Sequence, residues 1–332
     1  MKIAFLSENN FKGTVPRTFE NARTEFAWML ALGAKHHPIQ EFKKVKKYDA
    51  VFVILPKLRT YLSADASQMM EPVSDPKANL CNPSFIEFLQ SKNKKVYIIQ
   101  EGPNWLFNDY EVKQQYDHYL CLEKCDGIFV HNKLDKRFYE GLTYGQQKVE
   151  VIPTLMIEDT LKDIEPKAEE KTLIGGNFSR WYGGFQSFMV ARLFDNKIWT
   201  QTSHSKRKGE EAIEGINHFD RLTWLNWMKE VSKFKYAVHL MPTVAAGTFS
   251  LNCAYFGIPC IGNMDVDTQI TCFPACSVRV DDVKSATIVA EQLKNNEPFY
   301  NEVSKFAKEA YRKYYGEEVF TKNMMEILNG KD

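Results

Sequence analysis

Short apolar runs alternate with segments of helical periodicity along the whole chain. Apolar runs predict strands at residues 3–6, 50–55, 96–99, 127–130 and 149–152, and again at 172–174, 197–200, 236–240 and 258–261. Helical spacing predicts helices at 18–32, 85–90, 109–125, 185–194, 222–231, 250–256, 283–295, 300–315 and 317–328. Strands that are apolar nearly throughout and alternate with helices are typical of parallel sheets covered on both faces.

A change in composition divides this pattern into two halves. Residues 158–171 are acidic and lysine-rich with few apolar positions, which is typical of a linker. We therefore expect an N-terminal Rossmann-like domain at 1–157 and a second one at 172–315. A C-terminal helix within 316–332 is expected to pack back on the first domain. The predicted class is α/β, with two doubly wound domains facing across a cleft, and ligands bound beyond the carboxyl ends of the strands.

Composition excludes some classes of partner and compartment. The 332 residues are 44% hydrophobic and carry a net charge of +1, so no global field marks a nucleic-acid or membrane protein. No apolar run approaches the roughly 20 residues of a membrane span, and the first apolar run is too short for a signal peptide. We expect a cytoplasmic protein whose seven scattered cysteines are buried, reduced thiols. No group of residues has metal-site spacing, so no metal is expected.

The segment 245–262 is the strongest candidate for chemistry. A turn at Gly247 leads into a helix of small residues, which ends before a buried strand. The amides of Gly247, Thr248, Phe249 and Ser250, together with the positive end of the helix dipole, favour binding of a diphosphate. The hydroxyls of Thr248 and Ser250 would add hydrogen bonds. Taken alone, the segment is better explained as an ordinary helix cap followed by a packed helix.

Three other loops carry groups suited to phosphate. Arg180 lies in the glycine-rich loop 175–185, and it is either a phosphate ligand or a solvated loop residue. Gly13 and Thr14 follow the first strand and are predicted to approach a diphosphate, with Arg17 contacting the same ligand or a second, anionic one; a plain turn is the alternative. Lys206 and Lys208 also follow a strand, so they are candidates for phosphate contacts. The tryptophans of the helix 222–231 are predicted to be core residues.

The glycine-rich loop and the later helix, in this order, resemble the donor half of GT-B glycosyltransferases of the retaining, nucleotide-sugar-dependent type. The helix ends in Gly257-Ile258-Pro259, as in that family. Val244 and Asn252 stand where the family usually has two glutamates. Asn252 would then hold the ribose hydroxyls through neutral hydrogen bonds. The segments 96–104, 125–133 and 177–181 are also similar to those of phage DNA α-glucosyltransferases.

This resemblance implies a metal-independent hexosyl- or pentosyltransferase without a cofactor. The donor would be a nucleotide-diphosphate sugar, with a UDP-sugar favoured, and the acceptor a hydroxyl of a modified DNA base or a glycan. Glu101 would receive or align the acceptor proton, and His131 would contact the donor phosphate or sugar. An exposed loop glutamate and a structural histidine are the alternatives for these two residues. A non-catalytic nucleotide-sugar binder and a sugar-nucleotide epimerase remain the alternative functions.

Overall fold

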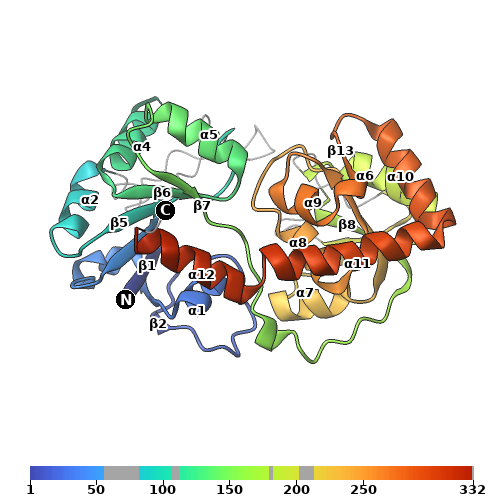
Figure 1. Ribbon diagram of the computed structural model, residues 1–332, viewed down its shortest axis with the longest axis horizontal. Coiled ribbons are helices and arrows are strands. Elements are labelled where there is room, and N and C mark those ends of the chain that lie inside the picture. The colour runs from blue at the N-terminus through green and yellow to red at the C-terminus, as the bar shows by residue number, and fades with distance from the viewer. Residues whose placement is uncertain (56–81, 106–111, 179–181, 202–212, 331–332) are drawn as a thin grey trace. The chain divides into compact units, whose positions relative to one another are not determined.

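Two compact units make up the computed structural model, which describes residues 1–55, 82–105, 112–178, 182–201 and 213–330. Unit 1 comprises Met1–Val15 and Leu32–Ile152, and unit 2 comprises Pro16–Ala31 and Pro153–Asp332. The expected boundaries were 1–157, 158–171 and 172–315. The contacts instead group residues 16–31 and the C-terminal helix with unit 2. Each unit has helices packed around its own sheet (Figure 1).

Unit 1 holds a sheet of order β2-β3-β1-β4-β5-β6-β7, parallel throughout except for the short edge strand β2. Its described elements are β1 (Ile3–Ser7), β2 (Gly13–Thr14), β3 (Lys35–Pro38), η1 (Ile39–Lys44), β4 (Ala50–Ile54), α2 (Pro83–Gln90), β5 (Val96–Ile99), α4 (Val112–Lys124), β6 (Gly127–Val130), α5 (Lys133–Leu142) and β7 (Val149–Val151). The central strands are buried along their length, as the continuous apolar runs predict.

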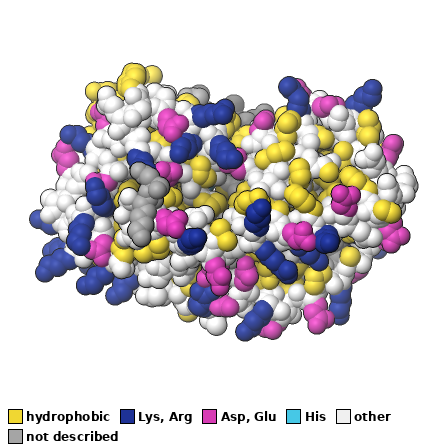
Figure 2. Space-filling view, viewed as in Figure 1, with side chains coloured by type: hydrophobic (Ala, Val, Ile, Leu, Met, Phe, Trp, Pro, Cys, Tyr) yellow, Lys and Arg dark blue, Asp and Glu magenta, His cyan; other side chains and the backbone are white. Residues whose placement is uncertain are grey.

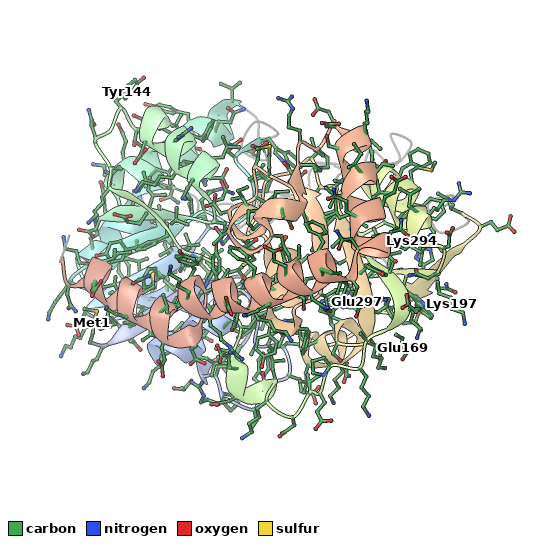
Figure 3. All side chains as sticks on the ribbon, turned by 45° about the vertical axis from the view of Figure 1, so that its right-hand side comes forward. Met1, Tyr144, Glu169, Lys197, Lys294 and Glu297 are labelled. Atoms are coloured by element: carbon green, nitrogen blue, oxygen red, sulfur yellow. The ribbon has the colours of Figure 1, made fainter. Side chains whose placement is uncertain are left out.

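Unit 2 holds a fully parallel sheet of order β10-β9-β8-β11-β12-β13. Its described strands are β8 (Glu169–Asn177), β9 (Lys197–Gln201), β10 (Ile216–Phe219), β11 (Phe234–His239), β12 (Cys260–Asn263) and β13 (Ser277–Val278). In Figure 3 the side chains of Glu169 and Lys197 mark the amino ends of β8 and β9, which lie at the same edge.

The remaining described helices are grouped with unit 2. They are α1 (Glu25–Leu32, all but its last residue), η3 (Glu158–Thr160), α6 (Gly184–Ala191), η5 (Arg192–Phe194), α7 (Trp224–Val231), α8 (Thr248–Phe256), α9 (Asp267–Cys272), η6 (Pro274–Cys276), α10 (Val283–Asn295), α11 (Glu297–Tyr314) and α12 (Glu317–Leu328). The described cysteines of both units are buried and not disulfide-bonded, in agreement with the predicted reduced thiols.

The strand order of unit 2 reverses between β8 and β11. The connection from β8 through α6 leads to β9 on one side, whereas the connection from β11 through α8 leads to β12 on the other. Because such crossovers are right-handed, α6 and α8 cover opposite faces of the sheet. The carboxyl ends of β8 and β11 therefore flank a crevice of the kind in which doubly wound sheets bind ligands.

The helix expected at 18–32 begins only at Glu25. Thr24 adopts a positive φ of 48°, and the preceding residues bond to α7 instead of continuing a helix. The Glu20 carbonyl accepts from the Leu225 N–H at 3.0 Å, and the Asn21 side chain accepts from the Trp224 N–H at 3.0 Å. Tertiary contacts thus override the helical spacing of the apolar residues. The end of the expected linker, from Glu169 on, is part of β8.

Positive and negative side chains are interspersed on the face shown in Figure 2, as the near-zero net charge leads one to expect. Among the described residues, no helix combines the length and apolar character that crossing a membrane requires. The described part of the chain also contains no cluster of three or more His, Cys, Asp or Glu side chains suited to a metal ion.

Candidate functional site

One pocket of unit 2, of about 320 Å³, lies at the start of α8 and is called the α8 pocket below. It is lined by Arg23, Gly176, Tyr182, Gln201, Arg221, Leu222, Trp224, Trp227, His239, Met241, Ala245, Ala246, Gly247, Thr248, Phe249 and Asn252. The lining includes residues from the carboxyl ends of β8, β9 and β11. The pocket therefore occupies the crevice that the strand order of the sheet predicts.

The first turn of α8 presents backbone donors to this pocket. By helix geometry, the N–H groups of Thr248, Phe249 and Ser250 have no carbonyl one turn before them. Gly247 precedes the helix with φ of +69°, and its carbonyl accepts a 2.8 Å hydrogen bond from Thr268 Oγ1. A Cβ at Gly247 would lie 2.0 Å from that oxygen. Glycine is therefore required for the backbone geometry that exposes these donors.

A histidine stands between the end of β8 and the first turn of α8. The His239 ring contacts Phe249 edge-on with 5.0 Å between centroids, and the Tyr182 ring stacks on it at 6.5 Å. A Cβ at Gly175 would lie 2.6 Å from both His239 Cγ and Phe249 Cδ1. The glycine of β8 thus makes room for the imidazole, and packing fixes the orientation of the ring.

Two arginines give the α8 pocket its charge. Arg23 comes from the segment that precedes α1, and Arg221 from the loop before α7. Neither side chain forms an ion pair with another described residue, and no aspartate or glutamate is among the described residues that line the pocket. Together with the positive end of α8, these cations favour an anion, above all one with oxygen atoms for bidentate hydrogen bonds.

Asn252 lines the pocket, but its amide already has partners. In the orientation that satisfies both neighbours, its nitrogen donates to the Thr248 carbonyl and its oxygen accepts from the Trp227 indole N–H, each at 3.1 Å. Trp224 and Trp227 are buried, as the predicted core role requires, and they also line the pocket. The Asn252 side chain therefore links α8 to α7 within this wall.

The predicted donor residues divide between the pocket and other places. Gly247, Thr248, Phe249 and Asn252 line it, whereas Ser250 does not, and the Ser250 hydroxyl donates to Gln269 Oε1 at 2.9 Å. The buried hydrogen bond to Gln269 therefore competes with the predicted contact between the Ser250 hydroxyl and a diphosphate. Arg180, Lys206 and Lys208 lie outside the described residues, so their predicted phosphate contacts stay predictions.

Four predicted residues lie in unit 1. Gly13 and Thr14 form β2, at the edge of the sheet, where they pair with His36 and Lys35. Glu101 and His131 follow the neighbouring strands β5 and β6 at their carboxyl ends; Glu101 is partly exposed and His131 is buried. The parallel pairing of β5 with β6 thus brings the two predicted catalytic residues to the same edge of the sheet.

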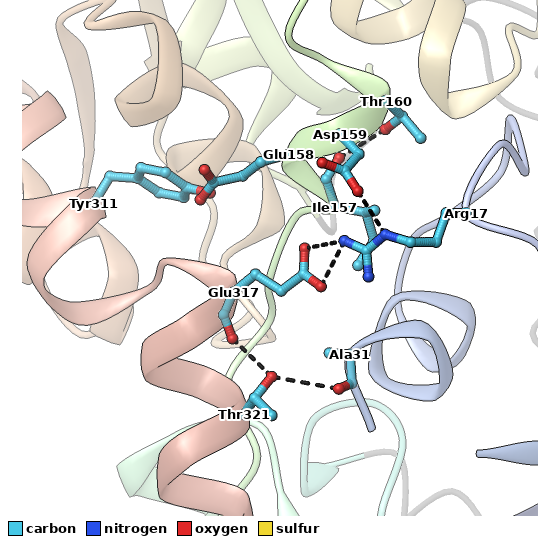
Figure 4. A network of polar contacts seen from close by, with 9 residues as sticks. All are labelled: Arg17, Ala31, Ile157, Glu158, Asp159, Thr160, Tyr311, Glu317 and Thr321. Atoms are coloured by element: carbon cyan, nitrogen blue, oxygen red, sulfur yellow. Dashed lines mark hydrogen bonds and ion pairs between the residues drawn. The ribbon is translucent and has the colours of Figure 1, made fainter. Parts of the chain in front are cut away.

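Arg17 occupies a different hollow of unit 2 (Figure 4). Its Nε donates to Asp159 at 2.6 Å and its Nη2 to both carboxylate oxygens of Glu317 at 2.8 Å. The hydrogen bond to Glu317 is the main cause of the raised pKa of Arg17. Thr321 Oγ1 donates to the Glu317 carbonyl at 2.9 Å. The Arg17 guanidinium, which was predicted to contact a phosphate, is thus already paired with two carboxylates. Arg17 is therefore not part of the donor site proposed below.

We expect Arg17→Ala to lower the free energy of unfolding by about 1 kcal/mol, the upper range for a partly exposed ion pair. The loss arises because the bidentate bond joins the segment before α1 to the start of α12. Arg279→Ala is the matched control, since its pair with Asp281 is exposed and local, and we expect no measurable change. Equal effects in urea denaturation of the two variants would contradict a stabilising role for the Arg17 network.

Sequence reasoning missed Arg23, Arg221 and His239. His239 ends a predicted strand, so the rule that ligands lie at carboxyl ends could have found it. The arginines carried no such signal, because they enter the pocket from irregular segments nearly two hundred positions apart in the chain.

No protein-family model matches the chain, and no curated protein is similar enough in sequence to count as a relative. Solved structures do match. An alpha-glucosyltransferase in complex with UDP and a 13-mer DNA containing an HMU base superposes with a TM-score of 0.63 at 12% identity, covering 99% of both chains. Sucrose-phosphate synthase from Thermosynechococcus elongatus gives 0.63 at 11% identity, covering 99% of this chain and 98% of its own.

A third match is S. aureus TarM, bound to fondaparinux, alpha-GlcNAc-glycerol and UDP, with a TM-score of 0.55 at 12% identity. It covers 72% of this chain, which spans about half (51%) of the TarM chain. All three are GT-B glycosyltransferases. The chain has the GT-B fold, and the predicted fold class is confirmed.

Proposed function

We propose that this GT-B chain is a glycosyltransferase that binds a nucleotide-diphosphate sugar, with UDP as the nucleotide, in the α8 pocket and transfers the sugar to a hydroxyl. The observation that carries the proposal is the charge of the pocket. The start of α8 and two arginines that form no ion pair with another described residue meet in one crevice at the switch point of the sheet. Structural neighbours bound to UDP support the choice of nucleotide.

The same groups account for the departure of the nucleotide. When the bond to the sugar breaks, negative charge grows on the diphosphate. The amides of Thr248 and Phe249 are fixed before the reaction by the helix and by Gly247, so they stabilise that charge without reorganising. Arg23 and Arg221 add full positive charges. We propose that they supply the electrostatic stabilisation of the leaving group, in keeping with the predicted metal-independent reaction.

The acceptor side of the proposal rests on unit 1. Glu101 is proposed to accept the proton of the acceptor hydroxyl as that oxygen attacks the anomeric carbon. His131, on the adjacent strand end, is proposed as a second contact to the sugar or phosphate. A hydroxylated DNA base and a glycan are both proposed as acceptor classes. The DNA-bound alpha-glucosyltransferase, which matches over 99% of both chains, supports the first of these.

One observation favours a second candidate function, a non-catalytic nucleotide-sugar binder. Val244 and Asn252 replace the two family glutamates, and the Asn252 amide is held by Thr248 and Trp227. The described lining residues therefore include no carboxylate that could accept hydrogen bonds from the sugar hydroxyls. A binder needs only the diphosphate contacts, which the pocket retains. No observation favours the epimerase.

Titration calorimetry with UDP-glucose, followed by an assay for glucose released from it, tests these alternatives. Binding together with slow hydrolysis is the expected result, because water can take the place of an absent acceptor hydroxyl as the nucleophile. Binding without hydrolysis or transfer to any hydroxyl acceptor would leave the binder as the function. No binding of UDP-glucose, UDP or GDP-sugars would overturn both.

Removal of both pocket arginines should weaken the donor complex strongly. We expect Arg23→Ala/Arg221→Ala to raise the Kd for UDP-glucose by roughly 10- to 150-fold, which corresponds to about 1.5–3 kcal/mol for charged hydrogen bonds. Arg192→Ala is the matched control, since Arg192 is an exposed arginine of unit 2 outside the α8 pocket. An affinity equal to that of the control would remove the two arginines from the site.

A further inference from the structure

The α8 pocket contains a buried histidine to which no role has yet been given. His239 is the last residue of β11, at the point where the strand order of unit 2 reverses. It is 8% exposed and lines the pocket beside the first turn of α8. Its ring is fixed from two sides by Phe249 and Tyr182. A polar ring held in the lining of a pocket suited to an anion is expected to contact the ligand.

An unsatisfied hydrogen-bonding group of this ring also indicates a contact to a ligand. His239 Nε2 is buried and has no hydrogen-bond partner among the described residues. The indole Nε1 of Trp224, in the same lining, is likewise buried and unpartnered. An unsatisfied buried polar group costs roughly 1–3 kcal/mol, so its persistence calls for an explanation. A ligand whose acceptor oxygens enter the pocket would supply a hydrogen-bond partner for each of these two groups, which explains why they persist.

The charges around His239 determine what such a ligand does to it. Tyr182, on the turn before α6, stacks on the ring, and Gly175 and Gly176 of β8 and Gly262 of β12 bring no charge. Arg23 and Arg221 are the charged side chains of the described lining, which has no carboxylate. Burial lowers the pKa of His239 to about 4, so the ring is neutral in the free protein near pH 7.

We propose that His239 is a donor-binding residue whose imidazole hydrogen-bonds an anionic oxygen of the bound diphosphate and takes up a proton as that anion enters. This rests on the proposed function of the α8 pocket. The anion supplies the negative charge that the free pocket lacks, and a diphosphate next to the ring favours the imidazolium form. The imidazolium then adds one positive charge to the arginines and the helix dipole.

The affinity for the donor is expected to depend on pH, because binding changes the protonation state of His239. The pKa of His239 is about 4 in the free protein and higher in the complex, so binding takes up a proton between these two values. The affinity for the donor therefore rises as the pH falls through that window, by at most about tenfold per pH unit for one proton. Above the pKa of the complex the affinity no longer depends on this group.

Calorimetric titration of the full chain with UDP-glucose between pH 5 and 8 tests the proposal. UDP-glucose is the suitable probe because it has no terminal phosphate, whose second proton titrates near about pH 6. Titrations in two buffers of different ionisation enthalpy count the protons taken up, without any variant. We expect uptake in the acidic part of the range and a rising affinity. His239→Gln keeps a hydrogen-bond donor but cannot titrate, so it should bind with no pH slope.

His118→Gln is the matched control. His118 is buried in unit 1, burial also lowers its pKa to about 4, and it bonds to Gln100 Oε1 at 3.0 Å. We expect this variant to keep the wild-type slope. Binding of UDP-glucose without proton uptake, or loss of the slope in His118→Gln as well, would overturn the role of His239 and leave the donor site standing. Failure of the wild-type chain to bind UDP-glucose, UDP or GDP-sugars would instead overturn the proposed function itself.

Discussion

Gly247→Ala is expected to abolish measurable UDP-glucose binding and to lower the free energy of unfolding by roughly 2–4 kcal/mol. Two effects add. A residue with a Cβ is strained at φ of +69°, and the new methyl group would lie 2.0 Å from Thr268 Oγ1 and 2.9 Å from Val266 Cγ1. Relief of the clash moves either the start of α8 or α9, and both movements displace the amides that face the pocket.

Gly145→Ala separates these two effects. Gly145 has nearly the same φ, +70°, but a Cβ there would meet nothing within 4 Å. It belongs to unit 1 and is not among the residues that line the α8 pocket. We expect Gly145→Ala to lose only the free energy of unfolding that a Cβ costs at a positive φ, and to bind UDP-glucose like the wild type. Thermal unfolding and calorimetry of both variants give the comparison. If Gly247→Ala binds UDP-glucose normally, the start of α8 does not hold the diphosphate.

Glu101→Gln should reduce sugar transfer by roughly 10²- to 10⁴-fold, the usual contribution of a general base. The amide keeps the size of the side chain but cannot accept the acceptor proton. Donor binding should be unchanged, because the α8 pocket belongs to unit 2 and Glu101 to unit 1. The measurements are the transfer rate with a hydroxylated acceptor at saturating donor and the Kd for UDP-glucose.

Glu123→Gln is the control for Glu101→Gln. Glu123 is an exposed carboxylate of α4 in the same unit, and it accepts a hydrogen bond from the Tyr119 hydroxyl. Its neutralisation should leave transfer intact. Near wild-type turnover of Glu101→Gln would show that another group takes the proton, and an equal loss in both variants would indicate a general effect of charge on unit 1.

Much of the candidate site was accessible from local patterns. The turn at Gly247, the helix that follows it and the Gly257 end were predicted within a few residues, because a glycine with left-handed backbone geometry bounds the helix at each end. The strands around it were predicted from their continuous apolar runs. Short edge elements such as β2 and β13, of two residues each, carry too little pattern to be predicted.

Other features depended on distant contacts. The helix expected at 18–32 lost its first turns because Glu20 and Asn21 bond to the start of α7, some two hundred positions later. Those bonds belong to the same irregular segment that delivers Arg23 to the α8 pocket. The partners of Arg17 and Ser250 could likewise not be predicted from neighbouring residues. Glu317 and Gln269 bind the two groups that the sequence alone suggested as phosphate ligands.

Local patterns were sufficient to predict the α/β alternation, the helix start proposed to bind an anion and the resemblance to GT-B enzymes, because hydrophobic period and glycine placement act over neighbouring residues. Which charged and polar side chains meet at the start of α8 depends instead on how distant segments pack together. His239 reaches the pocket because the strand order reverses between β8 and β11, and Arg23 reaches it because Glu20 and Asn21 bond to the start of α7. Both arrangements are set by contacts between distant residues, which no local pattern encodes.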